Sequence, residues 1–212
     1  MNTPSTTNLK FDSTKALPVM ESFYTIQGEG FHQGKAAYFI RLAGCDVGCT
    51  WCDVKDSWDA EEHEIVPISQ LKKSLQFSKA EIVVITGGEP AMYNLEGLTT
   101  MVKNLGLKTH IETSGAYPIT GTWDWICVSP KRFKKALQEC LIQAHELKVI
   151  IAHKNDFRFA QNYSKLVNAE CKLYLQPEWN VAEDMMPEII SFVKESPQYR
   201  ISLQVHKYLN IP

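Results

Sequence analysis

Residues 81–90, EIVVITGGEP, join an apolar, β-branched run to a turn of two glycines, a glutamate and a proline. Such a run predicts a buried strand, and the glycines let the backbone turn closely at its end. The next segment, Leu95–Leu105, has a helical apolar pattern between Asn94, a good N-cap, and Gly106, a good helix stop. Strand, turn and helix together form one unit of an α/β fold.

The same unit recurs along the chain. Further strands are predicted at Ala36–Leu42, Lys108–Glu112, Trp125–Val128, Leu147–Ile151, Lys172–Gln176 and Arg200–Gln204. Further helices are predicted at Ile68–Phe77, Phe133–Ala144, 156–167 and 181–193. Alternating strands and helices imply parallel strands with right-handed crossovers. Because a closed eight-fold barrel needs about 250 residues, we expect an incomplete TIM-type barrel with about six parallel strands.

Length and composition indicate one domain. The chain has 212 residues, of which 44% are hydrophobic, and a formal net charge of −2. Its polar start predicts that residues 1–18 form a flexible extension and that residues 19–212 form the domain. The balanced charge disfavours a nucleic-acid partner. Without a secretory signal or a bilayer-length apolar run, we expect a soluble, cytoplasmic protein that does not bind membranes.

Three of the six cysteines, Cys45, Cys49 and Cys52, are spaced C-x3-C-x2-C directly after a predicted strand. In a reducing compartment such a group indicates a metal site. Three thiolates are one ligand short of a closed zinc site, but they suit a 4Fe–4S cubane with one open iron. A zinc site remains an alternative if His63 or His32 supplies the fourth ligand.

This cysteine spacing, with Trp51 before the third cysteine and GGEP about forty residues later, resembles the radical S-adenosylmethionine (SAM) enzymes. More specific segments follow the same order as in one family, the 7-carboxy-7-deazaguanine synthases. They are FYTIQGEG (23–30), FIRLAGC (39–45), WCD (51–53), IETSG (111–115), VSPK (128–131), LQP (175–177) and HKYLNIP (206–212).

The resemblance implies a radical SAM lyase of queuosine and 7-deazapurine biosynthesis. The reaction would convert 6-carboxy-5,6,7,8-tetrahydropterin to 7-carboxy-7-deazaguanine with loss of ammonia. A SAM-derived radical, rather than a side chain, would carry the chemistry. The resemblance also implies a homodimer and an external reductant such as flavodoxin.

Site residues are carried over from the matched segments. The cluster would bind Cys45, Cys49 and Cys52. The pterin would contact Ile26, Gln27, Gly28, Glu29, Arg41, Thr86, His206 and Pro212, the last through its free carboxylate. SAM would contact Trp51, Cys52, Asp53, Gly87, Gly88, Glu89, Glu112, Ser114, Ser129, Pro130, Lys131, Gln176, Pro177, Glu178 and Trp179.

Residue chemistry supports some of these roles and leaves alternatives open. Glu89 and nearby carbonyls can accept hydrogen bonds from the ammonium group of SAM. Glu29 could accept from ring N–H groups, or it could be a solvated turn residue. Arg41 lies in an apolar strand and needs an anion, which is either the substrate carboxylate or a structural salt-bridge partner.

One position departs from the family. The resemblance implies a magnesium ligand from a threonine after WCD, but this chain has Val54, whose side chain has no oxygen. The ion would then keep more water ligands, use Asp53 or Asp56, or be dispensable. Two other functions remain open on sequence alone: a small glycyl-radical-activating enzyme with the same cysteine spacing, and a non-catalytic zinc-stabilised binding module.

Overall fold

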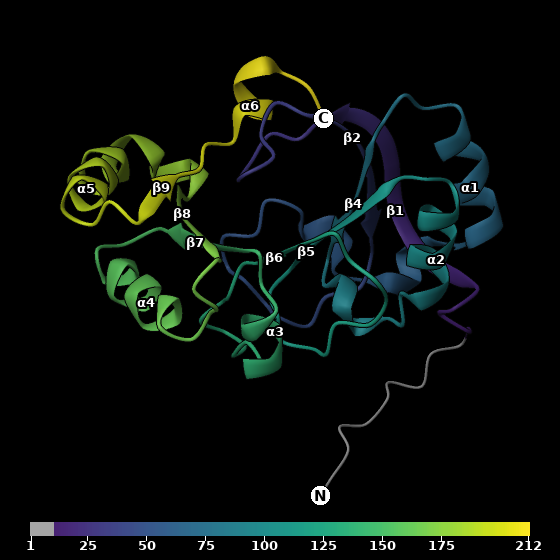
Figure 1. Ribbon diagram of the computed structural model, residues 1–212, viewed down its shortest axis with the longest axis horizontal. Helices are drawn as coiled ribbons and strands as arrows, with labels where there is room; N and C mark the ends of the chain where they lie inside the picture. Colours follow the sequence, from purple (N-terminus) through teal and green to yellow (C-terminus); the bar gives the residue numbers. More distant parts are fainter. Residues whose placement is uncertain (1–10) are drawn as a thin grey trace, which may run out of the picture.

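The computed structural model describes residues 11–212, in which nine strands form one sheet in the order β3-β1-β2-β4-β5-β6-β7-β8-β9 (Figure 1). β1 (Ala16–Ile26) lies antiparallel to β2 (Ala36–Leu42) and β3 (Glu64–Pro67). From β2 onward the strands are parallel. They are β4 (Ile82–Gly87), β5 (Lys108–Thr113), β6 (Trp125–Val128), β7 (Glu146–Ile151), β8 (Lys172–Pro177) and β9 (Tyr199–Ile201). β3 and β9 are the two edges of the sheet, so the barrel is open and the expected fold class is confirmed.

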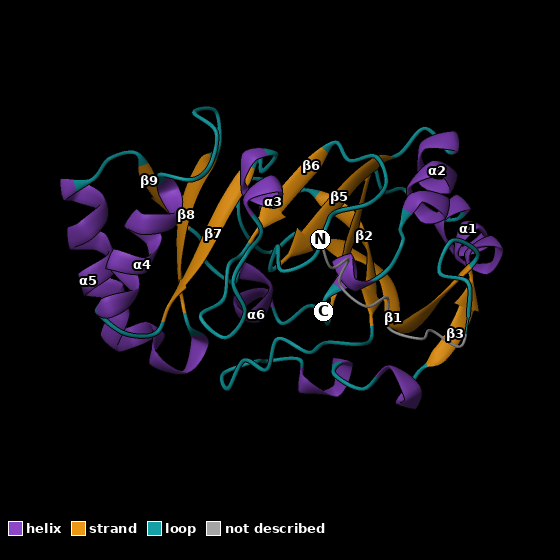
Figure 2. Cartoon of the chain, turned by 90° about the horizontal axis from the view of Figure 1, so that it is seen from below, coloured by secondary structure: helices purple, strands orange, loops and turns teal. Residues whose placement is uncertain are grey.

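Helices flank the sheet. They are α1 (Ile68–Gln76), α2 (Glu96–Asn104), α3 (Gln138–Ile142), α4 (Asn155–Ser164), α5 (Ala182–Glu195) and α6 (Val205–Leu209). Short 3-10 helices lie at η1 (Lys55–Ser57), η2 (Ala60–Glu62), η3 (Pro90–Met92) and η4 (Trp179–Val181). Figure 2 shows α1 and α2 beside one end of the sheet and α4 and α5 beside the other. No helix in residues 11–212 combines the length and apolar character that crossing a membrane requires.

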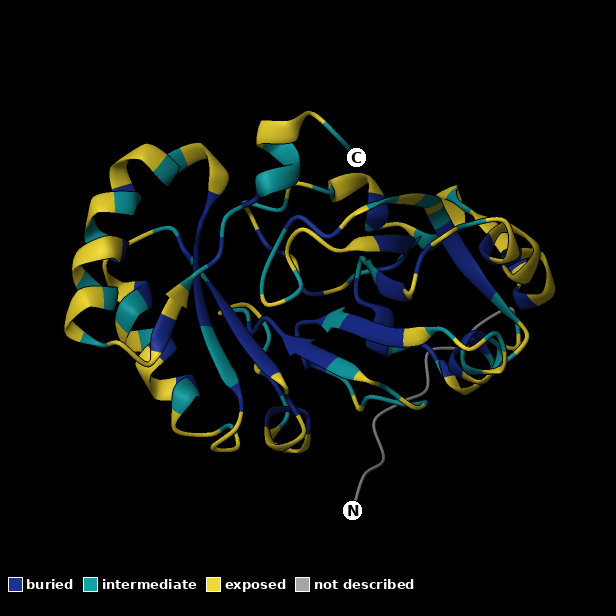
Figure 3. Ribbon diagram, turned by 45° about the horizontal axis from the view of Figure 1, so that its top comes forward, coloured by how far each residue is buried: buried dark blue, intermediate teal, exposed yellow. Residues whose placement is uncertain are grey.

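The two faces of the sheet differ in chemistry because side chains alternate along each strand. On β7, Leu147, Val149 and Ile151 belong to the main core, which packs against the helices. Lys148 lies between them in sequence and lines the cavity on the opposite face. Figure 3 shows the result: buried strands inside helices whose outer surfaces are exposed. The helix-facing side of the sheet stabilises the fold, and the other side is free to carry function.

Two expectations about the chain need correction. Residues 16–18, which we expected in the extension, begin β1, and Leu17 is fully buried. Residues 1–10 lie outside the described part of the chain. The predicted helix Phe133–Ala144 is reduced to α3, because residues 133–137 bond to neighbouring loops: the backbone N–H of Leu137 donates to the carbonyl of Gly115 at 2.8 Å.

Candidate active site

A cavity of about 700 Å³ opens at the carboxyl ends of the parallel strands. All residues predicted to hold the cluster, SAM or the pterin line this cavity except Pro130. The sequence did not single out several other lining residues, among them Phe23, Phe39, Lys148, Gln204 and Lys207. The parallel strands bring the residues at their carboxyl ends together at one edge of the sheet. β1, the cysteine loop and the segment 202–212 supply other parts of the lining.

The cysteine loop is folded back on the segment that follows it. The N–H of Gly44 donates to the carbonyl of Ser57 at 2.7 Å, and that of Cys45 donates to Trp58 at 3.0 Å. The hydroxyl of Tyr93 donates to the carbonyl of Ala43 at 2.8 Å. These bonds fix the start of the loop at the end of β2, beside the cavity.

The three cysteines fit an iron–sulfur cluster by donor chemistry. All three thiols lie on the wall of the same cavity, on one loop. Burial raises the pKa of Cys45, and it raises the pKa of Cys49 to about 11. Within residues 11–212 no three metal-ligating side chains converge as a preformed metal site, so the thiols must draw together and lose protons when they bind a cluster.

Neither histidine proposed as a zinc ligand reaches this cavity. The Nε2 atom of His63 lies 2.7 Å from the carbonyl oxygen of Asp56. His32 packs among aromatic rings, with its ring centroid 4.6 Å from that of Trp125. Neither histidine named for the zinc alternative therefore lies on the cavity wall that carries the three cysteines.

The glycines of the GGEP turn have a structural reason that we did not foresee. Gly87 has φ +123°, and a Cβ atom there would lie 2.1 Å from the carbonyl oxygen of Leu42. A Cβ atom on Gly88 would lie 2.3 Å from the carbonyl oxygen of Gly44. The two glycines thus let the end of β4 pack directly on the backbone that leads into the cysteine loop.

The Glu89 side chain is 1% exposed and bonded on both oxygens. Oε1 accepts from the N–H of Ala91 at 3.0 Å and from the hydroxyl of Thr113 at 2.5 Å. Oε2 accepts from the N–H and the hydroxyl of Ser114. This carboxylate therefore orders the strand ends around the predicted SAM site as well as facing the cavity.

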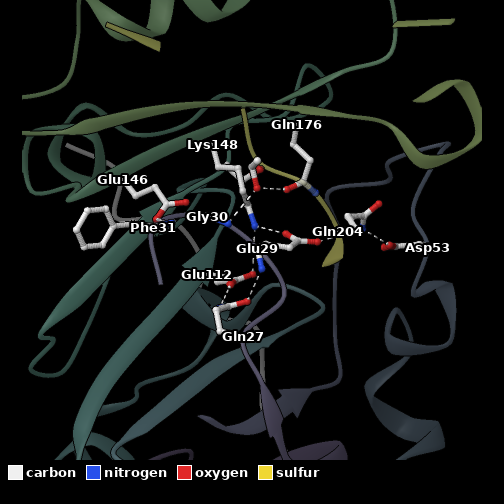
Figure 4. A network of polar contacts seen from close by, with 12 residues as sticks. Gln27, Glu29, Gly30, Phe31, Asp53, Glu112, Glu146, Lys148, Gln176 and Gln204 are labelled. Atoms are coloured by element: carbon white, nitrogen blue, oxygen red, sulfur yellow. Dashed lines mark hydrogen bonds and ion pairs between the residues drawn. The ribbon is translucent and has the colours of Figure 1, made fainter. Parts of the chain in front are cut away.

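A polar network lies at the other side of the cavity (Figure 4). The ammonium of Lys148 pairs with Glu29 and lies 3.6 Å from Oε2 of Glu112. Gln27 donates to Oε1 of Glu112 at 2.9 Å. Burial alone would raise the pKa of Glu29, but the charge of Lys148 lowers it to about 2. Glu29 is thus an ionised, bonded residue rather than a solvated turn residue.

The segment 202–212 closes over this network. The N–H of Val205 donates to the carbonyl of Gly28 at 3.0 Å. A Cβ atom on Gly28 would lie 2.3 Å from Nδ1 of His206, so a glycine is needed where the two segments cross. The hydroxyl of Thr25 donates to the main-chain oxygen O of Pro212 at 3.2 Å. Early and late parts of the chain therefore form one wall of the cavity.

Gln176, expected near SAM, is also tied to this wall. Its side-chain oxygen accepts from the hydroxyl of Ser202 at 2.8 Å, and Ser202 accepts from the N–H of Gly30 at 3.0 Å. Glu178 accepts from the N–H of Asn180 at 3.2 Å. The end of β8 is thereby fixed relative to residues 27–30, the QGEG loop.

Arg41 has the structural partner that we had considered as the alternative. Its Nε donates to Glu21 at 2.7 Å, and the two side chains are 21% and 43% exposed. Arg41 also lines the cavity, on the same face as Thr86, its register partner on β4. Glu21 therefore supplies, within the chain, the anion that the sequence required for Arg41, and the position of Arg41 on the cavity wall leaves it available to a further anion.

Ser129 and Lys131 occupy the end of β6. Lys131 donates to the carbonyl and hydroxyl oxygens of Ser129 at 2.9 and 2.6 Å. Its ammonium lies 5.5 Å from the ring centroid of Trp51, next to Cys52. Burial lowers the pKa of Lys131. The ammonium of Lys131 therefore lies beside the cysteine loop.

The residues near Val54 offer a magnesium ion one oxygen ligand fewer than the family resemblance implies. Val54 lines the cavity but offers no side-chain oxygen. The Asp53 carboxylate receives contacts from Gln204 and Lys207, both at 3.3 Å from Oδ2. Its charge is therefore already engaged by a lysine.

Sequence reasoning could have found Lys148. It is the single charged residue inside LKVII, and the argument applied to Arg41 applies equally to it. Lys207 lies in the matched segment HKYLNIP but was not assigned a role, and for Gln204 the sequence offered no comparable signal. The stacked rings of Phe23 and Phe39, 5.6 Å apart, come from the antiparallel pair β1–β2, which was not predicted.

Comparisons with known proteins agree with this geometry. A family model described as a 4Fe-4S single cluster domain matches residues 26–164. The 7-carboxy-7-deazaguanine synthase of Flavobacterium psychrophilum is 53% identical over 92% of this chain and 93% of its own length. That of a Synechocystis strain is 44% identical over 93% and 95%. The crystal structure of QueE from Escherichia coli superposes with a TM-score of 0.81 at 31% identity, covering 90% of this chain and 95% of that one.

Proposed function

The chain belongs to the 7-carboxy-7-deazaguanine synthase family of radical SAM lyases in queuosine biosynthesis, and we propose how its residues divide the work. The observation that supports these proposed roles is that four separate segments of the chain line one shared cavity. The cysteine loop, the GGEP turn, the QGEG loop and the segment 202–212 all line it. The glycyl-radical-activating alternative is set aside, because the synthase relatives match almost the whole chain.

The cluster would be held by Cys45, Cys49 and Cys52. When bound, it supplies the electron that splits SAM, and its open iron is the place where SAM attaches. The protein contributes the fixed loop, the nearby ammonium of Lys131 and a partly enclosed wall. These features shield a reactive radical from water.

SAM would occupy the strand ends between the cluster and β8. Backbone carbonyls of the GGEP turn, together with Glu89, would accept from its ammonium group. Ser129 and Lys131 would face its carboxylate or ribose, and Gln176, Pro177, Glu178 and Trp179 would form the adenine side. The bonds made by Glu89 and Gln176 support this arrangement because they hold these groups in place before a ligand arrives.

The carboxypterin would lie against the QGEG loop. Its ring N–H groups need acceptors, and Glu29 can supply one on that wall. We propose Glu112, which the sequence assigned to SAM, as a second acceptor, because Gln27 of this loop donates to it at 2.9 Å. Its carboxylate needs a cation, for which Arg41 is the candidate, with His206 and Thr86 nearby on the cavity lining.

The residues of this chain provide few ligands for a magnesium ion. We propose that Val54 lowers affinity for the ion, because the family's threonine oxygen is missing and Lys207 already pairs with Asp53. We further propose a cytoplasmic homodimer that receives electrons from a small reductant such as flavodoxin.

Metal analysis after anaerobic reconstitution tests the cluster assignment. About four irons per chain are expected from a 4Fe–4S cluster, and combined replacement of Cys45, Cys49 and Cys52 by alanine should abolish iron binding. Alanine at Cys171, away from the cavity, is the matched control and should retain the iron. One zinc per chain in place of iron would contradict the assignment.

A further inference from the structure

Lys148 is a buried cation for which no role has been assigned so far. It lies on β7, and the residue is 4% exposed. Its side chain crosses to the cavity face, where it pairs with Glu29 and approaches Glu112 (Figure 4). A buried lysine is costly unless it is paired, so these two carboxylates are what keeps it charged.

A third carboxylate near Lys148 is engaged elsewhere. Glu146, on the same strand, accepts from the N–H of Phe31 and from the indole N–H of Trp125, both at 3.1 Å. Burial raises the pKa of Glu146. The ion pairs of the Lys148 ammonium therefore go to Glu29 and Glu112, the two acidic residues of this network that line the cavity.

Both partners of Lys148 also hold other segments. Glu29 accepts from the side-chain amide of Gln204 at 3.0 Å, and Glu112 accepts from Gln27 at 2.9 Å. Lys148 is thus the centre of a network that joins the QGEG loop, β5 and the segment 202–212.

We propose that Lys148 is a positioning residue for the pterin: its ammonium pairs with Glu29, lies 3.6 Å from Oε2 of Glu112, and holds both carboxylates in place as hydrogen-bond acceptors for the N–H edge of the substrate. The inference rests on the proposed function. Without the ammonium, burial favours the protonated form of Glu29. A protonated carboxyl group presents a donor where the substrate also presents a donor, so binding weakens although the shape of the cavity is kept.

Kinetics of four variants test this role: Lys148→Met, Lys148→Arg, Glu29→Gln and the double variant Lys148→Met/Glu29→Gln. Lys148→Met should raise KM for the carboxypterin by about tenfold or more, the scale of one lost charged hydrogen bond. Lys148→Arg should recover part of this loss because it keeps the charge. Cleavage of SAM in the absence of pterin should change less than KM for the pterin, since the proposal places Lys148 on the pterin side of the cavity.

The double variant keeps the test valid if Lys148→Met alone does not fold. A methionine beside an ionised buried Glu29 is destabilising, whereas the pair of methionine and glutamine carries no buried charge at these two positions. The double variant should fold and still show the raised KM. A KM equal to wild type in any folded variant that lacks the ammonium would overturn the inference.

Two controls separate this inference from the function itself. Wild-type enzyme is assayed first, and if it fails to convert the carboxypterin with an intact cluster, it is the proposed function that fails. Lys165→Met, at an exposed position after α4, should leave KM unchanged. Equal changes of KM in Lys165→Met and Lys148→Met would also overturn the positioning role.

Discussion

The carboxylate of Glu89 accepts the backbone N–H of Ser114 at 2.8 Å, which bonds the turn after β4 to the end of β5. Radical SAM chemistry needs its cofactor held in a fixed orientation, and this bond fixes two neighbouring strand ends relative to one another. The structure thus shows how a motif assigned to SAM binding also builds the edge on which SAM would rest.

Replacement of Glu89 by alanine should destabilise the protein strongly. Four donors, from Ala91, Thr113 and Ser114, lose their acceptor in a buried place. We expect a loss of unfolding free energy on the order of 3–5 kcal/mol, measured by urea denaturation. Glu170→Ala, at an exposed position, should change it by less than about 0.5 kcal/mol. A similar small change in both variants would contradict the structural role of Glu89.

Replacement of Gln204 by glutamate should weaken pterin binding. The amide of Gln204 lies between Glu29, at 3.0 Å, and Asp53, at 3.3 Å. A third carboxylate there repels both and should displace the segment 202–212, so we expect KM to rise by about tenfold. Gln204→Met, which only removes the bonds, should have a smaller effect. Gln161→Glu, on the exposed side of α4, is the control and should leave KM unchanged. A larger rise of KM in Gln204→Met than in Gln204→Glu would argue against charge repulsion.

Buried His110 should make the fold sensitive to acid. Burial lowers its pKa to about 3 from 6.5, so below pH 6.5 the unfolded chain binds a proton that the folded chain excludes. Stability should fall by roughly 1.4 kcal/mol per pH unit between pH 6.5 and 3 from this group. His110→Phe should flatten the slope of unfolding free energy against pH, whereas the exposed control His153→Gln should not. Parallel curves for wild type and His110→Phe would refute the assignment.

Val54→Thr should change the response to magnesium. The added hydroxyl supplies the oxygen that the family places there, so the variant should reach maximal turnover at lower magnesium concentration than wild type. Turnover is measured across a magnesium titration after treatment with a chelator. Identical curves for the two proteins would show that Val54 does not set magnesium affinity.

Much of the fold follows from local patterns, because each central strand is a short apolar run followed by a helix. β1 was not predicted, because only its first part, from Leu17 to Val19, is buried. The remaining residues of β1 are partly buried or exposed, so they form no apolar run. The first turns predicted for α3 are lost to tertiary bonds, such as the ion pair of Lys134 with Asp46 at 2.7 Å. Sequence periodicity contains no information about such distant partners.

The site divides in the same way. Motif residues could be placed because parallel strands gather their carboxyl ends, and only Pro130 fails to line the cavity. The network around Lys148 could not be predicted from the sequence, because Lys148 and Glu29 are 119 positions apart in the chain. For Arg41, the sequence predicted the need for an anion, but the antiparallel pairing that supplies Glu21 became visible only in the structure.

The most direct test of the account is an anaerobic reaction of the reconstituted enzyme with SAM, a low-potential reductant and 6-carboxy-5,6,7,8-tetrahydropterin. The account predicts 7-carboxy-7-deazaguanine and released ammonia in equal amounts, with neither formed when Cys45, Cys49 and Cys52 are replaced by alanine. SAM cleavage by an intact cluster without any deazaguanine product would contradict it.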